Sequence, residues 1–73
     1  MRILSHHRRA LALLANRPSG MTESMLIHAH KIPAEVLVEL VNAGLATVHV
    51  QRLGRRIKVT TVRITEAGRK AIA

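Results

Sequence analysis

The 73-residue chain carries twelve lysines and arginines against four acidic residues, for a net charge of +8, and it contains no cysteine, phenylalanine, tryptophan or tyrosine. A chain of this length folds as one domain at most, so we expect residues 1–73 to form a single domain. The composition excludes disulfides and thiolate metal sites, and no apolar run approaches the roughly 20 residues that span a membrane. We therefore expect a cytoplasmic protein.

The positive charge is segregated along the sequence. Residues 1–20 hold four arginines and no acid, residues 21–45 hold one lysine and three glutamates, and residues 46–73 hold seven basic residues and one glutamate. Clustered positive charge is typical of proteins that bind a polyanion. The alternative interpretation is that charge keeps an aliphatic chain soluble.

The first half of the sequence predicts three helices. The first covers residues 5–16, with Ser5 as its N-cap, and "RPSG" ends it. Its broad apolar face consists of Leu11, Leu14 and Ala15, with Ala10 and Leu13 beside them. The second is short, covers residues 23–30 and begins after Thr22, with Leu26 and Ala29 directed inward. The third covers residues 33–43, because Pro33 suits a first helical turn and Gly44 suits a left-handed cap.

From Ala46 the apolar period changes from 3.6 to 2, which predicts strands. We expect a strand over residues 46–51, a turn at "LGRR", and a returning strand over residues 57–64. Because Ile57 and Val62 fall out of phase, a bulge near Thr60 and Thr61 is expected. Thr65 is then placed to cap a final helix over residues 66–72.

This order is a helix-turn-helix followed by a β-hairpin. The stretches "MTESMLIHAHKIPAEVLVELVNAGLATV" and "GRRIKVTTVRITEAGRKAI" resemble the winged-helix domain of MarR-type and related bacterial transcriptional regulators. The resemblance rests on a Leu-x-x-x-Gly-Leu pattern and on a closing Ile-Thr-x-x-Gly-Arg pattern, which are Leu40, Gly44 and Leu45, and Ile64, Thr65, Gly68 and Arg69. It implies a small α+β winged helix-turn-helix with three helices, a two-stranded wing and a short C-terminal helix.

The resemblance also implies binding to double-stranded DNA through the third helix and the wing. The candidate DNA-binding residues are Lys31, Ala34, Glu35, Val38, Asn42, Arg52, Arg55, Arg56 and Lys58. Further candidate phosphate contacts are Arg8, Arg9, His28 and His30. Arginine suits phosphate because its planar donors match the phosphate oxygens. The expected function is therefore that of a small, non-catalytic transcriptional regulator.

Two departures from the family keep other functions open. The outer face of the third helix holds Glu35, Val38, Glu39 and Asn42, where the family usually presents polar or basic side chains. A protein-interaction adaptor that uses this face is the main alternative, and RNA binding is another. The family dimerises through additional terminal helices that this chain lacks, so a homodimer requires a different surface.

The sequence contains few residues that could form a catalytic or metal-binding site. It has no aspartate, no cysteine and no glycine-rich phosphate loop, so we expect no catalysis and no cofactor. Five histidines are present, but His6 and His7 are adjacent and diverge by about 100° on a helix. His28 and His30 are two residues apart and also diverge, so no metal site is expected.

Overall fold

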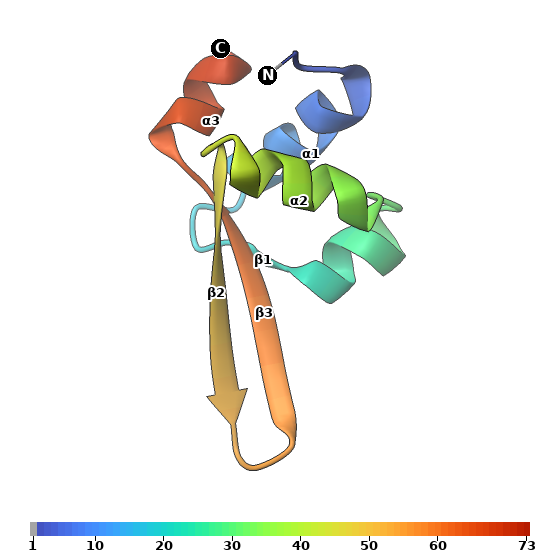
Figure 1. Ribbon diagram of the computed structural model, residues 1–73, viewed down its shortest axis with the longest axis vertical. Helices are drawn as coiled ribbons and strands as arrows, with labels where there is room; N and C mark the ends of the chain where they lie inside the picture. Colours follow the sequence, from blue (N-terminus) through green and yellow to red (C-terminus); the bar gives the residue numbers. More distant parts are fainter. Residues whose placement is uncertain (1) are drawn as a thin grey trace.

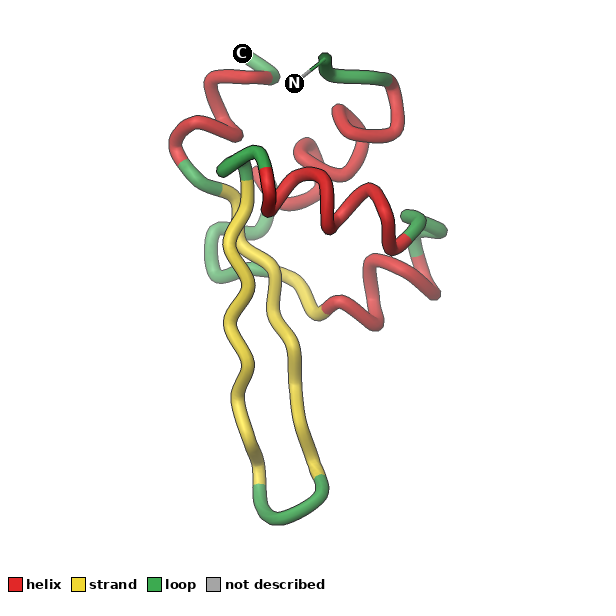
Figure 2. The backbone as a smooth tube through the Cα atoms, viewed as in Figure 1, coloured by secondary structure: helices red, strands yellow, loops and turns green. Residues whose placement is uncertain are grey.

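The computed structural model describes residues 2–73, which form an α+β fold with three α-helices, a short π-helix and a three-stranded antiparallel sheet (Figures 1 and 2). The elements in chain order are α1 (Ser5–Ala15), β1 (Met21–Thr22), η1 (Met25–Ala29), α2 (Ala34–Asn42), β2 (Ala46–Leu53), β3 (Ile57–Ile64) and α3 (Glu66–Ala71). No helix within residues 2–73 has the length and apolar character needed to cross a bilayer.

The helices gather at one end of the molecule, and the β2–β3 hairpin extends away from them (Figure 1). The molecule is therefore elongated, with extents of 39 × 22 × 21 Å. The core lies among α1, η1, α2 and the helix-proximal end of the sheet. It consists of eleven buried aliphatic side chains: Ala10, Leu11, Leu14, Met21, Leu26, Ile32, Val36, Leu37, Leu40, Ala46 and Val62.

The sheet has one strand more than the sequence predicts. Its order is β1-β3-β2, and β1 pairs with β3 through Met21↔Val62 and Thr22↔Thr61. Gly20 makes this approach feasible, because it has a φ of +96° and a Cβ there would lie 2.7 Å from Cγ2 of Thr61. The expectation of a two-stranded sheet is therefore wrong, since a two-residue strand leaves no alternation for sequence analysis to detect.

The β2–β3 ladder is regular. It runs from Ala46↔Ile64 to Leu53↔Ile57 without interruption, so the expected bulge is absent and β2 is two residues longer than predicted. Ile57 and Val62 point to opposite faces, as their spacing requires. The bulge is unnecessary because the hairpin leaves the core: Val62 is buried, whereas Ile57 is 60% exposed.

The helix boundaries largely agree with the expected ones, with local corrections. Leu4, not Ser5, occupies the N-cap position of α1. The Thr22 hydroxyl accepts a hydrogen bond from the Met25 N–H at 3.2 Å, as a capping residue does, but Ala29 is exposed rather than buried. Lys31 has a φ of +58°, so this lysine adopts the left-handed conformation in the turn between η1 and α2.

The two sequence patterns that carry the family resemblance contact each other. At the end of α2 the Leu45 N–H bonds to the Leu40 carbonyl at 2.9 Å, which closes the helix as a Schellman motif. The Leu45 carbonyl accepts from the Thr65 N–H at 3.1 Å. The Thr65 hydroxyl donates to the Gly44 carbonyl at 2.8 Å and accepts from the Gly68 N–H at 3.0 Å. The end of α2 and the start of α3 are therefore joined by backbone and capping bonds.

Gly68 is essential to this junction. It is buried in α3, and a Cβ at this position would overlap the Leu45 carbonyl oxygen. A helix interior normally disfavours glycine by about 1 kcal/mol relative to alanine. Glycine is retained here because the backbones of α3 and Leu45 approach closely.

We predict that Gly68→Ala lowers the free energy of unfolding by about 2 kcal/mol, because overpacking against a backbone carbonyl outweighs the gain in helix propensity. Urea denaturation followed by far-UV circular dichroism measures this. Ala67→Gly at the exposed neighbouring position is the control and should cost about 1 kcal/mol or less. A neutral or stabilising Gly68→Ala would contradict the close approach.

Candidate nucleic-acid interface

The hairpin presents the predicted cations to solvent. Arg52 and Lys58 are directly paired across the ladder, and Arg55 and Arg56 lie in the three-residue loop beyond it. All four are exposed, and within residues 2–73 none of them forms an ion pair. Because no acidic residue occurs between Ala46 and Thr65, their positive charge is uncompensated along the hairpin.

The alternation of side chains along the strands shows on which face of the hairpin these cations lie. Arg52 and Lys58 lie on the same face as Val48 and Val62, which is the face that turns toward the helices near the core. Arg55 and Arg56 follow Gly54, whose φ of +83° allows the chain to reverse. The cations therefore occupy one face and the loop of the hairpin, at the end farthest from α3 (Figure 1).

The exposed face of α2 borders a mainly apolar groove. The groove has a volume of about 240 Å³ and is lined by Glu23, Ala34, Leu37, Val38, Val41, Asn42, Val48 and Val62. Val38 is 58% exposed, and Val48 is 44% exposed on the opposite wall. The structure thus brings three candidate residues of α2, Ala34, Val38 and Asn42, next to the hairpin, and Glu35 is exposed on the same helix.

A second hollow of about 350 Å³ lies between η1 and β3. His28 and Lys58 both line it, together with the hydroxyl-bearing residues Thr22, Ser24 and Thr60, and with Glu23 and Val59. Hydroxyl, imidazole and ammonium groups all donate hydrogen bonds to phosphate oxygens. Glu23 lines both hollows, so they are neighbouring parts of the concave surface between α2, η1 and the hairpin, and its carboxylate is unfavourable for phosphate.

The remaining candidates lie apart from this surface or have structural partners. The Arg9 guanidinium donates a hydrogen bond to the His30 carbonyl, which joins α1 to the end of η1. Arg8 is exposed on α1, and Lys31 is exposed in the turn before α2. Arg9 therefore stabilises the helix packing, which sequence analysis did not anticipate because the two residues are 21 positions apart.

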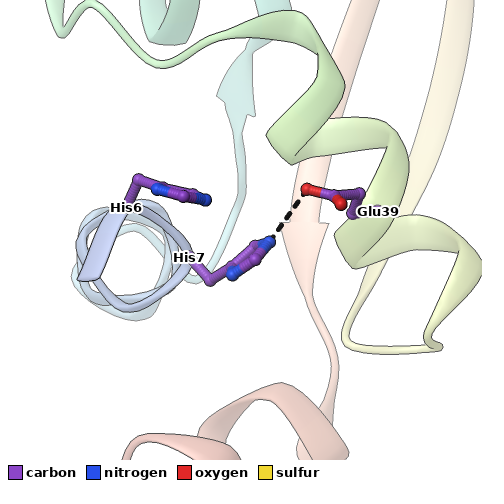
Figure 3. Close-up of side chains that lie close together, drawn as sticks. All are labelled: His6, His7 and Glu39. Carbon is purple, nitrogen blue, oxygen red and sulfur yellow. Dashed lines mark hydrogen bonds and ion pairs between the residues drawn. The ribbon is translucent and has the colours of Figure 1, made fainter. Parts of the chain in front are cut away.

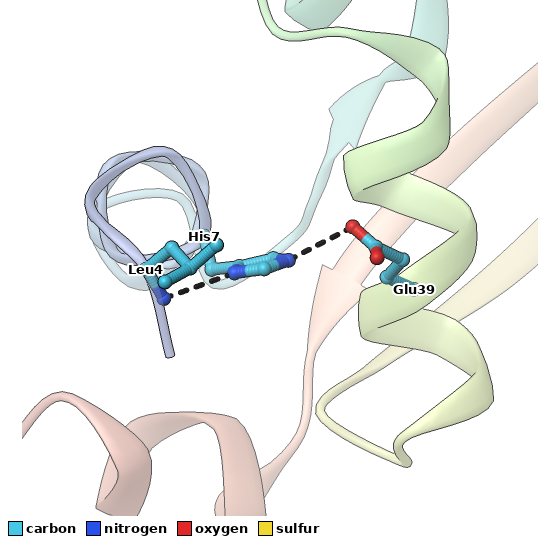
Figure 4. A network of polar contacts seen from close by, with 3 residues as sticks. All are labelled: Leu4, His7 and Glu39. Carbon is cyan, nitrogen blue, oxygen red and sulfur yellow. Dashed lines mark hydrogen bonds and ion pairs between the residues drawn. The ribbon is translucent and has the colours of Figure 1, made fainter. Parts of the chain in front are cut away.

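A polar bridge inside the helical layer was also missed. His7 is only 3% exposed, and its Nδ1 accepts a hydrogen bond from the Leu4 N–H at 3.0 Å (Figure 4). The other ring nitrogen, Nε2, therefore carries the proton and donates to Oε1 of Glu39 at 3.0 Å. This bridge connects the start of α1 to the middle of α2, so Glu39 is a packing residue as well as a surface charge.

His6 lies beside this bridge. Ligand atoms of His6, His7 and Glu39 lie within 4.8 Å of one another, and the two imidazole centroids are 4.5 Å apart (Figure 3). The expectation that the adjacent histidines diverge is therefore wrong, since rotation about their side-chain bonds offsets the helical angle. In the observed arrangement both nitrogens of His7 are occupied, which leaves His6 and Glu39 as ligands, fewer than zinc sites use.

Comparisons with known proteins give no independent guide to function: no protein-family model, no curated protein and no solved structure matches this chain. Function must therefore be inferred from the fold, the charge distribution and the surface described above.

We predict that His7 and Glu39 are energetically coupled. In a double-mutant cycle of His7→Ala and Glu39→Ala, the coupling free energy should be about 1 kcal/mol. Either single substitution already removes the hydrogen bond to the half-exposed carboxylate. The double variant should therefore be less destabilised than the sum of the two single variants. Thermal and urea denaturation of the four proteins measure it. The same cycle with His6→Ala is the control and should give a value near zero. Equal coupling in both cycles would contradict the bridge.

Proposed function

We propose that this protein is a small winged helix-turn-helix regulator that binds double-stranded DNA and catalyses no reaction. In this proposal α1, η1 and α2 are the helix-turn-helix, α2 is the recognition helix, and the β2–β3 hairpin is the wing. The observation that carries the proposal is a set of four exposed cations, none of them in an ion pair within residues 2–73, on a hairpin that projects from the helices: Arg52, Arg55, Arg56 and Lys58.

The arrangement of the concave surface supports the same proposal. DNA carries its charge on two regularly spaced backbones, and neutralising phosphates with arginine and lysine releases counterions. The hairpin offers four such cations, and His28 joins Lys58 in the adjoining hollow. A duplex on this surface would lie with one groove facing α2, with its backbone along the face of the hairpin that bears Arg52 and Lys58, and with the tip reaching the adjacent groove.

Sequence discrimination should be modest. Ala34 and Val38 can contact a thymine methyl group, Asn42 can bond to adenine, and Glu35 can accept from cytosine N4. The carboxylate of Glu35 also repels phosphate. Affinity therefore comes mainly from the wing, whose contacts position the protein without reading the sequence.

We predict that the wing determines the salt dependence of binding. Four phosphate contacts give a slope of log K against log salt of about −3 to −4 on duplex DNA. Replacing Arg52, Arg55 and Arg56 with alanine should make the slope shallower by about 3. Fluorescence anisotropy with a labelled random-sequence duplex across a salt series measures both slopes.

The matched control removes three cations elsewhere. Arg17, Arg69 and Lys70 are exposed and lie outside the wing, and their triple alanine variant has the same net charge as the wing variant. Its slope should remain close to that of the wild type. Equal slopes for the two variants would mean that the protein binds through net charge alone. A folded wild type without affinity for DNA at low salt would overturn the proposal.

An interaction with protein is the second candidate function, and the apolar groove favours it. Recognition helices that read DNA present polar side chains, whereas here Val38 and Val48 face each other across a groove large enough for an apolar side chain. A second copy of the chain or another protein would bury these valines. In this alternative the acidic and apolar face of α2 is an adaptor surface, and the basic wing serves solubility or RNA.

We predict that self-association, if the groove mediates it, depends on Val38. Sedimentation equilibrium should show a wild-type dimerisation constant that weakens at least tenfold in Val38→Asn, a loss of about 1.4 kcal/mol. The substitution should leave the fold unaffected, because Val38 is 58% exposed. Glu35→Gln is the matched control on the same face. A wild type that remains monomeric at all concentrations would remove the homodimer from this second candidate.

A further inference from the structure

The tip of the hairpin carries two large aliphatic side chains that are about half exposed to solvent. Leu53 and Ile57 form the last pair of the β2–β3 ladder, and they are 48% and 60% exposed. They lie on the face opposite Arg52 and Lys58, since the side chains of successive residues alternate. The tip is therefore apolar on one face and cationic on the other face and in the loop.

Protection against edge pairing does not explain the apolar pair. Exposed hairpins are normally protected by charged residues, and the tip already has Arg52, Arg55, Arg56 and Lys58. Leucine and isoleucine at an exposed tip instead increase the risk of aggregation. A partner that covers them while neutralising four cations resolves both features together.

We propose that the Leu53–Ile57 pair is an apolar wedge that enters the minor groove of duplex DNA, partly unstacks a base step and bends the duplex. This inference rests on the proposed DNA-binding function and adds a change in DNA shape to it. Minor-groove proteins bend DNA by inserting aliphatic side chains between base steps. Arginine is favoured in the same groove, where the negative potential is enhanced.

The geometry of the tip suits this role. The loop between Leu53 and Ile57 has only three residues, Gly54, Arg55 and Arg56, so both apolar side chains lie next to the arginines. The arginines can hold the flanking phosphates or the groove floor while the apolar pair contacts the sugars and base edges. The hairpin also projects well beyond the helices, which lets its tip enter a groove without a clash from α2 (Figure 2).

An anionic lipid surface also attracts basic and apolar side chains, but the composition favours DNA. Proteins that anchor at a bilayer surface typically use tryptophan or phenylalanine beside leucine, and the interface favours tryptophan and tyrosine. This chain contains none of the three aromatic residue types. Two aliphatic side chains give little membrane affinity by themselves, since even a single myristoyl chain binds only marginally.

The test measures bending separately from binding. A duplex of about 30 base pairs, labelled with a donor and an acceptor at its ends, reports bending by energy transfer, and a site of this length resists smooth bending. The wild type should increase the transfer efficiency. It should also bind a nicked duplex about tenfold more tightly than an intact one, because the nick lowers the cost of opening a step.

The decisive variant is Leu53→Thr with Ile57→Thr, which places β-branched residues with high strand propensity at both positions and removes the apolar tip. It should bind with the wild-type salt slope, because all four cations remain, but without bending and without the preference for the nick. Val50→Thr is the control, since Val50 is 52% exposed on the opposite face. It should bend DNA as the wild type does.

The outcomes separate this inference from the proposed function. A wild type that binds with a steep salt slope but neither bends DNA nor prefers the nick overturns the wedge and leaves DNA binding intact. A wild type without DNA affinity at low salt overturns both. Binding to phosphatidylserine vesicles that the double variant loses, with DNA left straight, also overturns the wedge and assigns the tip to lipid. The bending assay and the comparison of nicked with intact duplex need only the wild type. The inference therefore remains testable if the double variant fails to fold.

Discussion

The junction between Leu45 and Thr65 determines how the two halves of this protein are assembled. One carbonyl, that of Leu45, accepts the Thr65 N–H and lies against Gly68, while the Thr65 hydroxyl links the Gly44 carbonyl to the first turn of α3. The end of α2, the base of the hairpin and the start of α3 thus share one set of bonds. Because the chain has no aromatic residue to fill a larger core, these directional bonds supplement a core made of small and medium aliphatic side chains.

The sequence predicts most of the local structure, because caps and periodicities are local signals. Thr22, Gly44 and Thr65 act at helix ends as expected, and the change of period at Ala46 marks the first long strand. Features that depend on distant residues were missed. The strand β1 exists only because β3 lies beside it, and the buried His7 bonds to Glu39, 32 residues away. A single sequence contains no signal for such pairings.

The candidate site also has one part that the sequence predicted and one part that it did not. The cations were identified from charge segregation, because an uncompensated run of arginines is solvated wherever the fold puts it. The sequence did not reveal which other side chains of the hairpin and the helices are exposed beside these cations. Val48 and Val50 are apolar positions of the strand expected from Ala46, yet they are 44% and 52% exposed because β2 continues past the helices. Conversely, Arg9 looked like a free cation but bonds to the His30 carbonyl. The arrangement of the surface therefore depends on where the core ends.

The hairpin extends well beyond the core, and this has a consequence for its dynamics. Beyond His49↔Thr61, where the pairing with β1 ends, the ladder is held mainly by its own backbone bonds and cross-strand pairs, and a two-stranded hairpin alone is marginal in water. Its outer amides should therefore exchange with solvent through local opening, at a free energy below that of global unfolding. Whatever the hairpin binds must order it, and part of the interaction energy is spent on that ordering. The tip of the hairpin should consequently adjust its conformation to a binding partner, while the end next to the helices stays fixed by the core.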